Sequence, residues 1–85
     1  MSMVTELIAA VSDAERRIDD QIMKLQSFMT QVDSVSQRAD AAFSGSTVQY
    51  GKDMIEQLSL TKKQVNDTIG YLQQAKEKLI RVRMI

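Results

Sequence analysis

The chain has 85 residues with 11 basic and 11 acidic side chains, a formal net charge of zero, no Cys, His or Pro, and three Gly. This length supports one small domain at most, near the lower limit for a stable core. The missing Cys and His leave no disulfide, no thiolate or imidazole ligand for zinc and no imidazole base, and a neutral chain has no general attraction to nucleic acid. We therefore expect a small binding module without a cofactor or metal, and not an enzyme.

The first predicted helix runs from about residue 2 to residue 42 and shows apolar side chains at a spacing of seven. The first row consists of Val4, Val11, Ile18, Leu25, Val32 and Ala39. The second row, three residues further on, consists of Leu7, Ala14, Gln21, Phe28, Val35 and Ala42. A third row, four residues further on, is apolar at Ile8, Ile22, Met29 and Phe43 and polar at Glu15 and Ser36. This heptad pattern predicts a helix that packs along its length against another helix.

A turn is predicted at about residues 43–46, where the turn-forming residues of the chain gather in the stretch Phe43-Ser44-Gly45-Ser46-Thr47. Gly45 suits the left-handed residue that ends a helix. Ser46, with Gln49 three residues later, has the pattern of a capping box at the start of the next helix.

The second predicted helix covers about residues 47–84 and repeats the same three rows. Its first row consists of Gly51, Leu58, Val65, Leu72 and Leu79, and its second of Met54, Thr61, Thr68, Ala75 and Val82. Val48, Ile55 and Ile69 add to the stripe four residues further on. Two long amphipathic helices joined by one short turn predict an all-α fold, with residues 1–85 forming a single antiparallel helical hairpin.

The distribution of charge favours the same pairing. Residues 1–40 hold seven acids and four bases, whereas residues 41–85 hold four acids and seven bases. Folding at the turn brings Glu6, Asp13 and Glu15 near the basic residues Lys76, Lys78, Arg81 and Arg83. Exposed ion pairs contribute only ~0–1 kcal/mol each, so they bias the orientation of the helices and do not hold the fold.

The apolar stripe on each helix is wider than the single contact that two helices can share. We therefore expect the hairpin to pair with a second hairpin in a four-helix bundle, as a homodimer or a heterodimer. The predicted partner-binding face consists of Leu25, Phe28, Val32, Leu58, Val65, Ile69, Leu72 and Leu79.

Motifs for catalysis or nucleic-acid binding are weak. The Ser59-x-x-Lys62 pair lacks the companion motifs that give this spacing a catalytic meaning, and no glycine-rich phosphate loop is present. The basic segment 76–83 suits the negative end of a helix dipole, and a patch for an acidic partner or a membrane surface is the alternative. We expect a protein partner, no catalytic residues and no nucleic acid.

The turn carries a resemblance to a known family. A small helical hairpin with Phe43-x-Gly45 at its centre is similar to the WXG family, the early secreted antigenic target-like proteins of type VII secretion, in which a Trp-x-Gly turn joins two long helices. Phe43 stands in the place of the Trp, Gly45 matches the Gly, and Ser46 opens the second helix. The resemblance covers the whole chain in architecture and three to five residues in motif.

This resemblance implies a function in secretion, as an adaptor or targeting chaperone for a larger effector or as a secreted substrate. The family's export signal, a Tyr followed four residues later by an acid, is absent, because Met54 follows Tyr50 and Ala75 follows Tyr71 at that spacing. The chain therefore resembles, at least as much as a secreted substrate, the small helical partners of LXG toxins. This resemblance implies that its partner is the helical N-terminal domain of a larger effector. A self-assembling structural hairpin or a coiled-coil regulator unrelated to secretion is the alternative.

The sequence shows neither a transmembrane segment nor a signal peptide. The longest apolar run, from Leu7 to Val11, is far shorter than the ~20 residues that span a bilayer. The first base is Arg16, so the start of the chain lacks the cationic segment of a signal peptide. We expect a cytoplasmic protein before export, secreted without a signal peptide and without a transmembrane segment.

Overall fold

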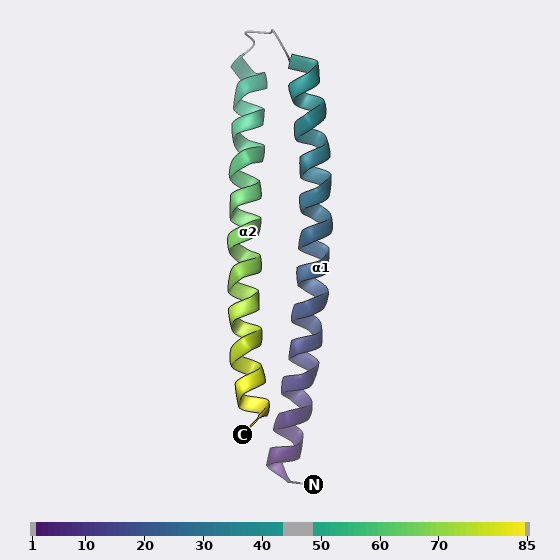
Figure 1. Cartoon of the computed structure of the whole chain (residues 1–85), viewed down its shortest axis with the longest axis vertical. Helices are drawn as coiled ribbons and strands as arrows, with labels where there is room; N and C mark the ends of the chain where they lie inside the picture. The colour runs from purple at the N-terminus through teal and green to yellow at the C-terminus, as the bar shows by residue number, and fades with distance from the viewer. Residues whose placement is uncertain (1, 44–48, 85) are drawn as a thin grey trace.

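The computed structural model describes residues 2–43 and 49–84. Two helices, α1 (Met3–Phe43) and α2 (Gln49–Arg83), lie side by side and run antiparallel, with both ends of the chain at the same end of the rod (Figure 1). The molecule measures 66 × 15 × 14 Å. The prediction of an all-α helical hairpin is confirmed.

The two helices meet along one line of contact, named here the seam. It consists of buried and half-buried positions that follow each other along each helix at alternating spacings of four and three residues. On α1 these positions are Val11, Glu15, Ile18, Ile22, Leu25, Met29, Val32, Ser36, Ala39 and Phe43. On α2 they are Gly51, Ile55, Leu58, Lys62, Val65, Ile69, Leu72, Lys76 and Leu79. This spacing keeps the same stripe of each helix in contact with its neighbour, as in a coiled coil.

The seam is built from the first and third heptad rows. The second row of α1, with Phe28 and Val35, and the second row of α2, with Met54 and Val82, lie beside the seam and are exposed. The reason lies in the third row of α2, where Lys62, Lys76 and Arg83 recur at the heptad spacing and meet acidic side chains of α1. The apolar heptad pattern alone does not show whether the second or the third row joins the first row in the seam. The charged residues of the third row do show it.

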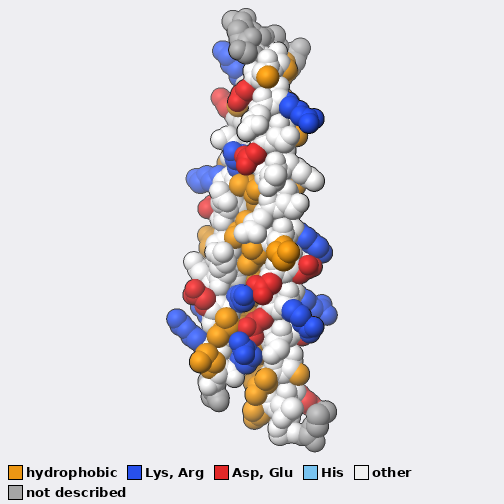
Figure 2. All heavy atoms as spheres, turned by 45° about the vertical axis from the view of Figure 1, so that its right-hand side comes forward, with side chains coloured by type: hydrophobic (Ala, Val, Ile, Leu, Met, Phe, Trp, Pro, Cys, Tyr) orange, Lys and Arg blue, Asp and Glu red, His pale blue; other side chains and the backbone are white. Residues whose placement is uncertain are grey.

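The core of the hairpin is small. Only four apolar side chains among the described residues, Val11, Ile22, Val32 and Ala39, are less than a tenth exposed, and none is completely buried. A compact protein of 9.6 kDa exposes roughly 5,100 Å² of surface, whereas this chain exposes 6620 Å². Figure 2 shows apolar side chains open to solvent between charged groups of both signs. The fold therefore leaves apolar surface that two helices cannot bury.

The helix ends differ slightly from the predicted bounds. At the start of α1, the Ser2 Oγ accepts a hydrogen bond from the Thr5 backbone N–H at 3.2 Å, which is an N-cap. Phe43 was predicted to open the turn, but it is the last residue of α1. The predicted turn and cap residues Gly45 and Ser46 lie outside the described residues.

The ring of Phe43 lies over α2 at Gly51. A Cβ atom added at Gly51 would lie 3.0 Å from the Cγ and Cδ1 atoms of the Phe43 ring. Glycine therefore leaves the space that the aromatic ring fills, so this pair closes the seam at the turn end of the hairpin.

Neither helix contains, within the described residues, a stretch long and apolar enough to cross a bilayer.

The two described helical glycines allow a matched test of this packing. Nothing lies within 4 Å of a Cβ built at Gly70, so Gly70→Ala should raise the free energy of unfolding by about 0.5–1 kcal/mol through helix propensity alone. Gly51→Ala should gain less, because the Phe43 ring must move. Urea denaturation followed by circular dichroism measures both. Equal gains in the two variants would contradict the packing of Phe43 on Gly51.

Candidate partner-binding surface

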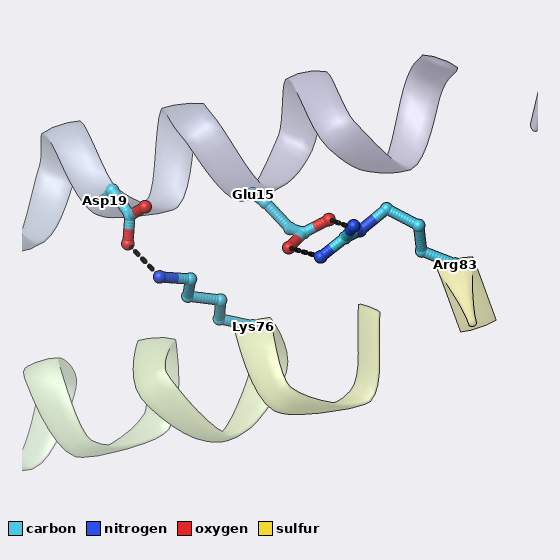
Figure 3. A network of polar contacts seen from close by, with 4 residues as sticks. All are labelled: Glu15, Asp19, Lys76 and Arg83. Atoms are coloured by element: carbon cyan, nitrogen blue, oxygen red, sulfur yellow. Dashed lines mark hydrogen bonds and ion pairs between the residues drawn. The ribbon is translucent and has the colours of Figure 1, made fainter. Parts of the chain in front are cut away.

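Among the residues that the structure describes, three ion pairs join the two helices, each with its acid on α1 and its base on α2. Arg83 donates from Nε to Glu15 Oε2 at 2.8 Å and from Nη2 to Glu15 Oε1 at 3.3 Å. Lys76 Nζ lies 2.7 Å from Asp19 Oδ1, as Figure 3 shows together with the Glu15 pair. The third pair joins Lys62 to Asp33. The opposite charges of the two halves of the chain thus meet along the seam.

The partners differ in part from those expected for the charged groups. Glu15 does meet Arg83, but Lys76 is paired with Asp19, and Asp13 bonds within α1, to Arg16 at 3.3 Å and Arg17 at 2.9 Å. Asp13 points away from α2, because it lies two residues before the seam position of Glu15 and so on another side of the helix.

Glu15 is the buried member of this network. Its residue is 8% exposed, whereas the other two acids that pair with α2, Asp19 and Asp33, have side chains that are about half exposed. A carboxylate at this depth needs its partner, and the two-pronged contact with Arg83 provides two charge-assisted hydrogen bonds. The pair thus fixes the alignment of the C-terminal end of α2 against α1.

The second heptad rows form a surface beside the seam, named here the uncharged face. On α1 it consists of Leu7, Ala14, Gln21, Phe28, Val35 and Ala42, and on α2 of Met54, Thr61, Thr68, Ala75 and Val82. At 100° per residue, each row lies roughly 80° around its own helix from the centre of the seam. Seen from one end of the rod, the residues of α1 and α2 follow each other in opposite senses because the helices are antiparallel. The second rows of both helices therefore face the same side of the hairpin.

Apolar side chains on this face are open to solvent. Phe28 is 42% exposed and Val35 48% exposed, and Met54 and Val82 are exposed to a similar degree. Thr61 and Thr68 donate their hydroxyls to the backbone carbonyls of Gln57 and Gln64, both at 2.9 Å. Their polar groups are thus satisfied within α2, and a partner that covers them would leave no hydroxyl without a hydrogen bond.

The opposite side of the seam is polar. The corresponding row of α1 carries Thr5, Ser12, Asp19, Gln26, Asp33 and Asp40, and that of α2 carries Lys52, Ser59, Asn66, Gln73 and Ile80. Two of the three interhelix ion pairs use acids of this row. The hairpin therefore has one polar, ion-paired side and one side without a formal charge.

The rim of the uncharged face carries only positive charge. The rows that border it hold Arg17, Lys24 and Arg38 on α1 and Lys78 on α2, all exposed, and no acid among the described residues. Arg17 pairs with Asp13 at 2.9 Å and Lys24 with Asp20 at 3.1 Å, in exposed pairs four residues apart. Such pairs contribute only about 0.3–0.5 kcal/mol, so these cations remain available to a stronger anionic partner.

The predicted partner-binding residues fall on two surfaces. Val32 is buried in the seam, and Leu25, Leu58, Val65, Ile69, Leu72 and Leu79 are half-buried there. Phe28 alone of the predicted set lies on the uncharged face. The prediction did not select Val35, Met54 or Val82, although the complete lack of charge in their rows is a signal that could have found them.

Within the described ranges 2–43 and 49–84, no group of three or more acidic residues has the arrangement of a metal site. Compared with known proteins, the chain matches no family model, no curated protein and no solved structure. Its resemblance to the WXG family therefore stays a prediction based on the turn residues and the hairpin.

The depth of Glu15 leads to a test by double-mutant cycles. We expect Glu15→Gln combined with Arg83→Gln to give a coupling free energy of about 1 kcal/mol, because Glu15 is buried while Arg83 is partly solvated. The Asp13–Arg17 pair within α1 should give no more than about 0.5 kcal/mol in the matched cycle of Asp13→Asn and Arg17→Gln. Chemical denaturation measures both, and equal couplings would contradict a buried, register-setting role for Glu15.

Proposed function

We propose that this hairpin is a helical interaction protein that binds another helical hairpin or the helical N-terminal domain of a larger effector. The observation that carries the proposal is the uncharged face, an exposed apolar surface along a rod whose own core holds few buried side chains. Exposed apolar rows of this kind mark an interaction surface when they are continuous and bordered by polar residues.

The area of exposed surface suits such a partner. The chain exposes about 1,500 Å² more than a compact protein of its mass. A standard interface covers about 800 Å² on each partner. A second pair of helices lying on the uncharged face would complete a four-helix bundle, in which every helix has two neighbours.

The proposed setting is type VII secretion, with the hairpin as an adaptor or targeting chaperone for an effector such as an LXG toxin. The support is the aromatic residue Phe43 at the end of α1, near the middle of a small helical hairpin, followed in sequence by Gly45 and Ser46. In this role the protein binds its partner in the cytoplasm before export.

Co-expression with the products of neighbouring genes tests the proposal. We expect a stable complex with a protein whose N-terminal region is helical, with a higher thermal unfolding midpoint than the hairpin alone, because a ligand that binds only the folded state stabilises it. Sedimentation equilibrium gives the mass of the complex. A stable monomer that binds none of these products would contradict the proposed function.

A seam variant shows whether binding needs the folded hairpin. Val65→Asp places a charge between the helices, which should cost at least about 2 kcal/mol and abolish binding together with helicity. Asn66→Asp is the matched control, because the adjacent Asn66 is exposed on the polar side and should leave both properties unchanged. Circular dichroism and co-purification report the outcome, and full helicity in Val65→Asp would show that the seam is misplaced.

A further inference from the structure

We propose that the uncharged face takes a pair of helices whose apolar stripe is bordered by Asp and Glu side chains, and that its occupant is a different chain and not a second copy of this one. This inference rests on the proposed function and names the chemistry of the partner.

Large and small side chains lie next to each other across the uncharged face, as the packing of another helix requires. The contacts of Lys62 with Asp33 and of Phe43 with Gly51 set the register of the two helices. In this register Phe28 lies level with Thr68, and Val35 lies level with Thr61. Each level thus places a large side chain beside a smaller one, and the side chains of a facing helix fit into such alternating spaces.

One position on the face requires a polar partner. Gln21 is exposed and is the only residue of the two rows whose side chain has amide hydrogen-bonding groups. Buried under an apolar stripe, this amide would lose its hydrogen bonds to water without replacement. We therefore expect the partner to carry a polar side chain at the level of Gln21, which also fixes the register of the complex.

Charge on the rim selects the partner. Arg17, Lys24 and Arg38 border the face along α1, and Lys78 borders it along α2. Arg38 and Lys78 make no ion pair with any residue that the structure describes, and the pairs of Arg17 and Lys24 are exposed. Carboxylates that flank the apolar stripe of a partner helix would meet these four cations at the edge of the interface, where opposite charges speed association and discriminate among partners.

The same charges disfavour a second copy. Two copies packed through their uncharged faces would bring their rims together, and each rim contributes Arg17, Lys24, Arg38 and Lys78 and no acid. On α1, Asp13 and Asp20 lie one row further from the face and bond to cations of their own helix, and on α2 Asp53 and Asp67 lie in the equivalent row outside the rim. A symmetric dimer would therefore gather like charges along its interface, which opposes pairing.

Two synthetic helical hairpins provide the probes. Both carry the same Leu and Ala stripe with one Gln at the level of Gln21, and they differ only in the residues that border the stripe, which are all Glu in one probe and all Lys in the other. We expect the protein to bind the Glu probe at least about tenfold more tightly than the Lys probe at 50 mM salt, a preference that falls as salt screens the rim. Isothermal titration calorimetry measures the affinity for each of the two probes, once at 50 mM salt and once at a higher salt concentration.

Variants of the rim and of the face separate the charge from the docking. Arg38→Glu with Lys78→Glu should remove the preference for the Glu probe, whereas Lys63→Glu with Arg81→Glu, which changes the net charge equally on other sides of α2, should retain it. Phe28→Asp should abolish binding of both probes. Its control is Gln26→Asp, on the polar side of the same helix, and it should bind normally. Circular dichroism establishes that each variant is as helical as the parent.

The possible failures are distinguishable. Equal affinity for the two probes, or a preference for the Lys probe, overturns the acidic partner and leaves the docking function standing. Failure to bind either probe overturns both the inference and the proposed docking face. A dimer in sedimentation equilibrium that Phe28→Asp dissociates and Gln26→Asp does not would identify the occupant as a second copy, and it would overturn the inference.

Discussion

The constraint on which this molecule depends is that two helices share only one seam. Each helix carries three apolar or partly apolar rows, but a pairwise contact uses two of them. In a larger bundle the third row would face another helix. In the hairpin it remains open, with Phe28 and Val35 exposed, and the core is limited to a few side chains. The small core and the uncharged face are thus two consequences of the same geometry.

Charge decides which rows become the seam. A hairpin that buried the second rows would also satisfy the apolar pattern, and it would hide Phe28 and Val35. It would, however, leave Lys62, Lys76 and Arg83 of α2 turned away from Asp33, Asp19 and Glu15. Individual surface ion pairs are weak, but the choice lies between two apolar contacts of similar quality, so modest electrostatic differences are sufficient. The buried carboxylate of Glu15 adds to this bias because it needs the guanidinium of Arg83.

Much of the fold follows from the sequence, because heptad periodicity and the gathering of turn residues in one place define two helices and one connection. The choice of rows does not follow, since the flanking rows lie on either side of the first row and only contacts with the other helix distinguish them. The prediction of partner-binding residues is limited in the same way, because it also depends on which row faces the other helix. Phe28 was predicted, whereas Val35, Met54 and Val82 were not, although no charged residue falls in their rows. The contact of Phe43 with Gly51 depends on the register of α2 against α1, which local pattern does not provide.

The small apolar side chains of the uncharged face limit how specifically it can recognise a partner by packing. Alanine, threonine and valine side chains fit many apolar stripes, so packing alone would discriminate poorly among amphipathic helices. Discrimination must then come from the few groups that differ from this background, which are the amide of Gln21 within the face and the four cations at its rim. If a partner covers the face, a hairpin with so small a core would gain stability from the contact, and binding would then be coupled to folding. Partner choice would therefore act through the rim, while stability of the complex would come from burial of the rows between the rims.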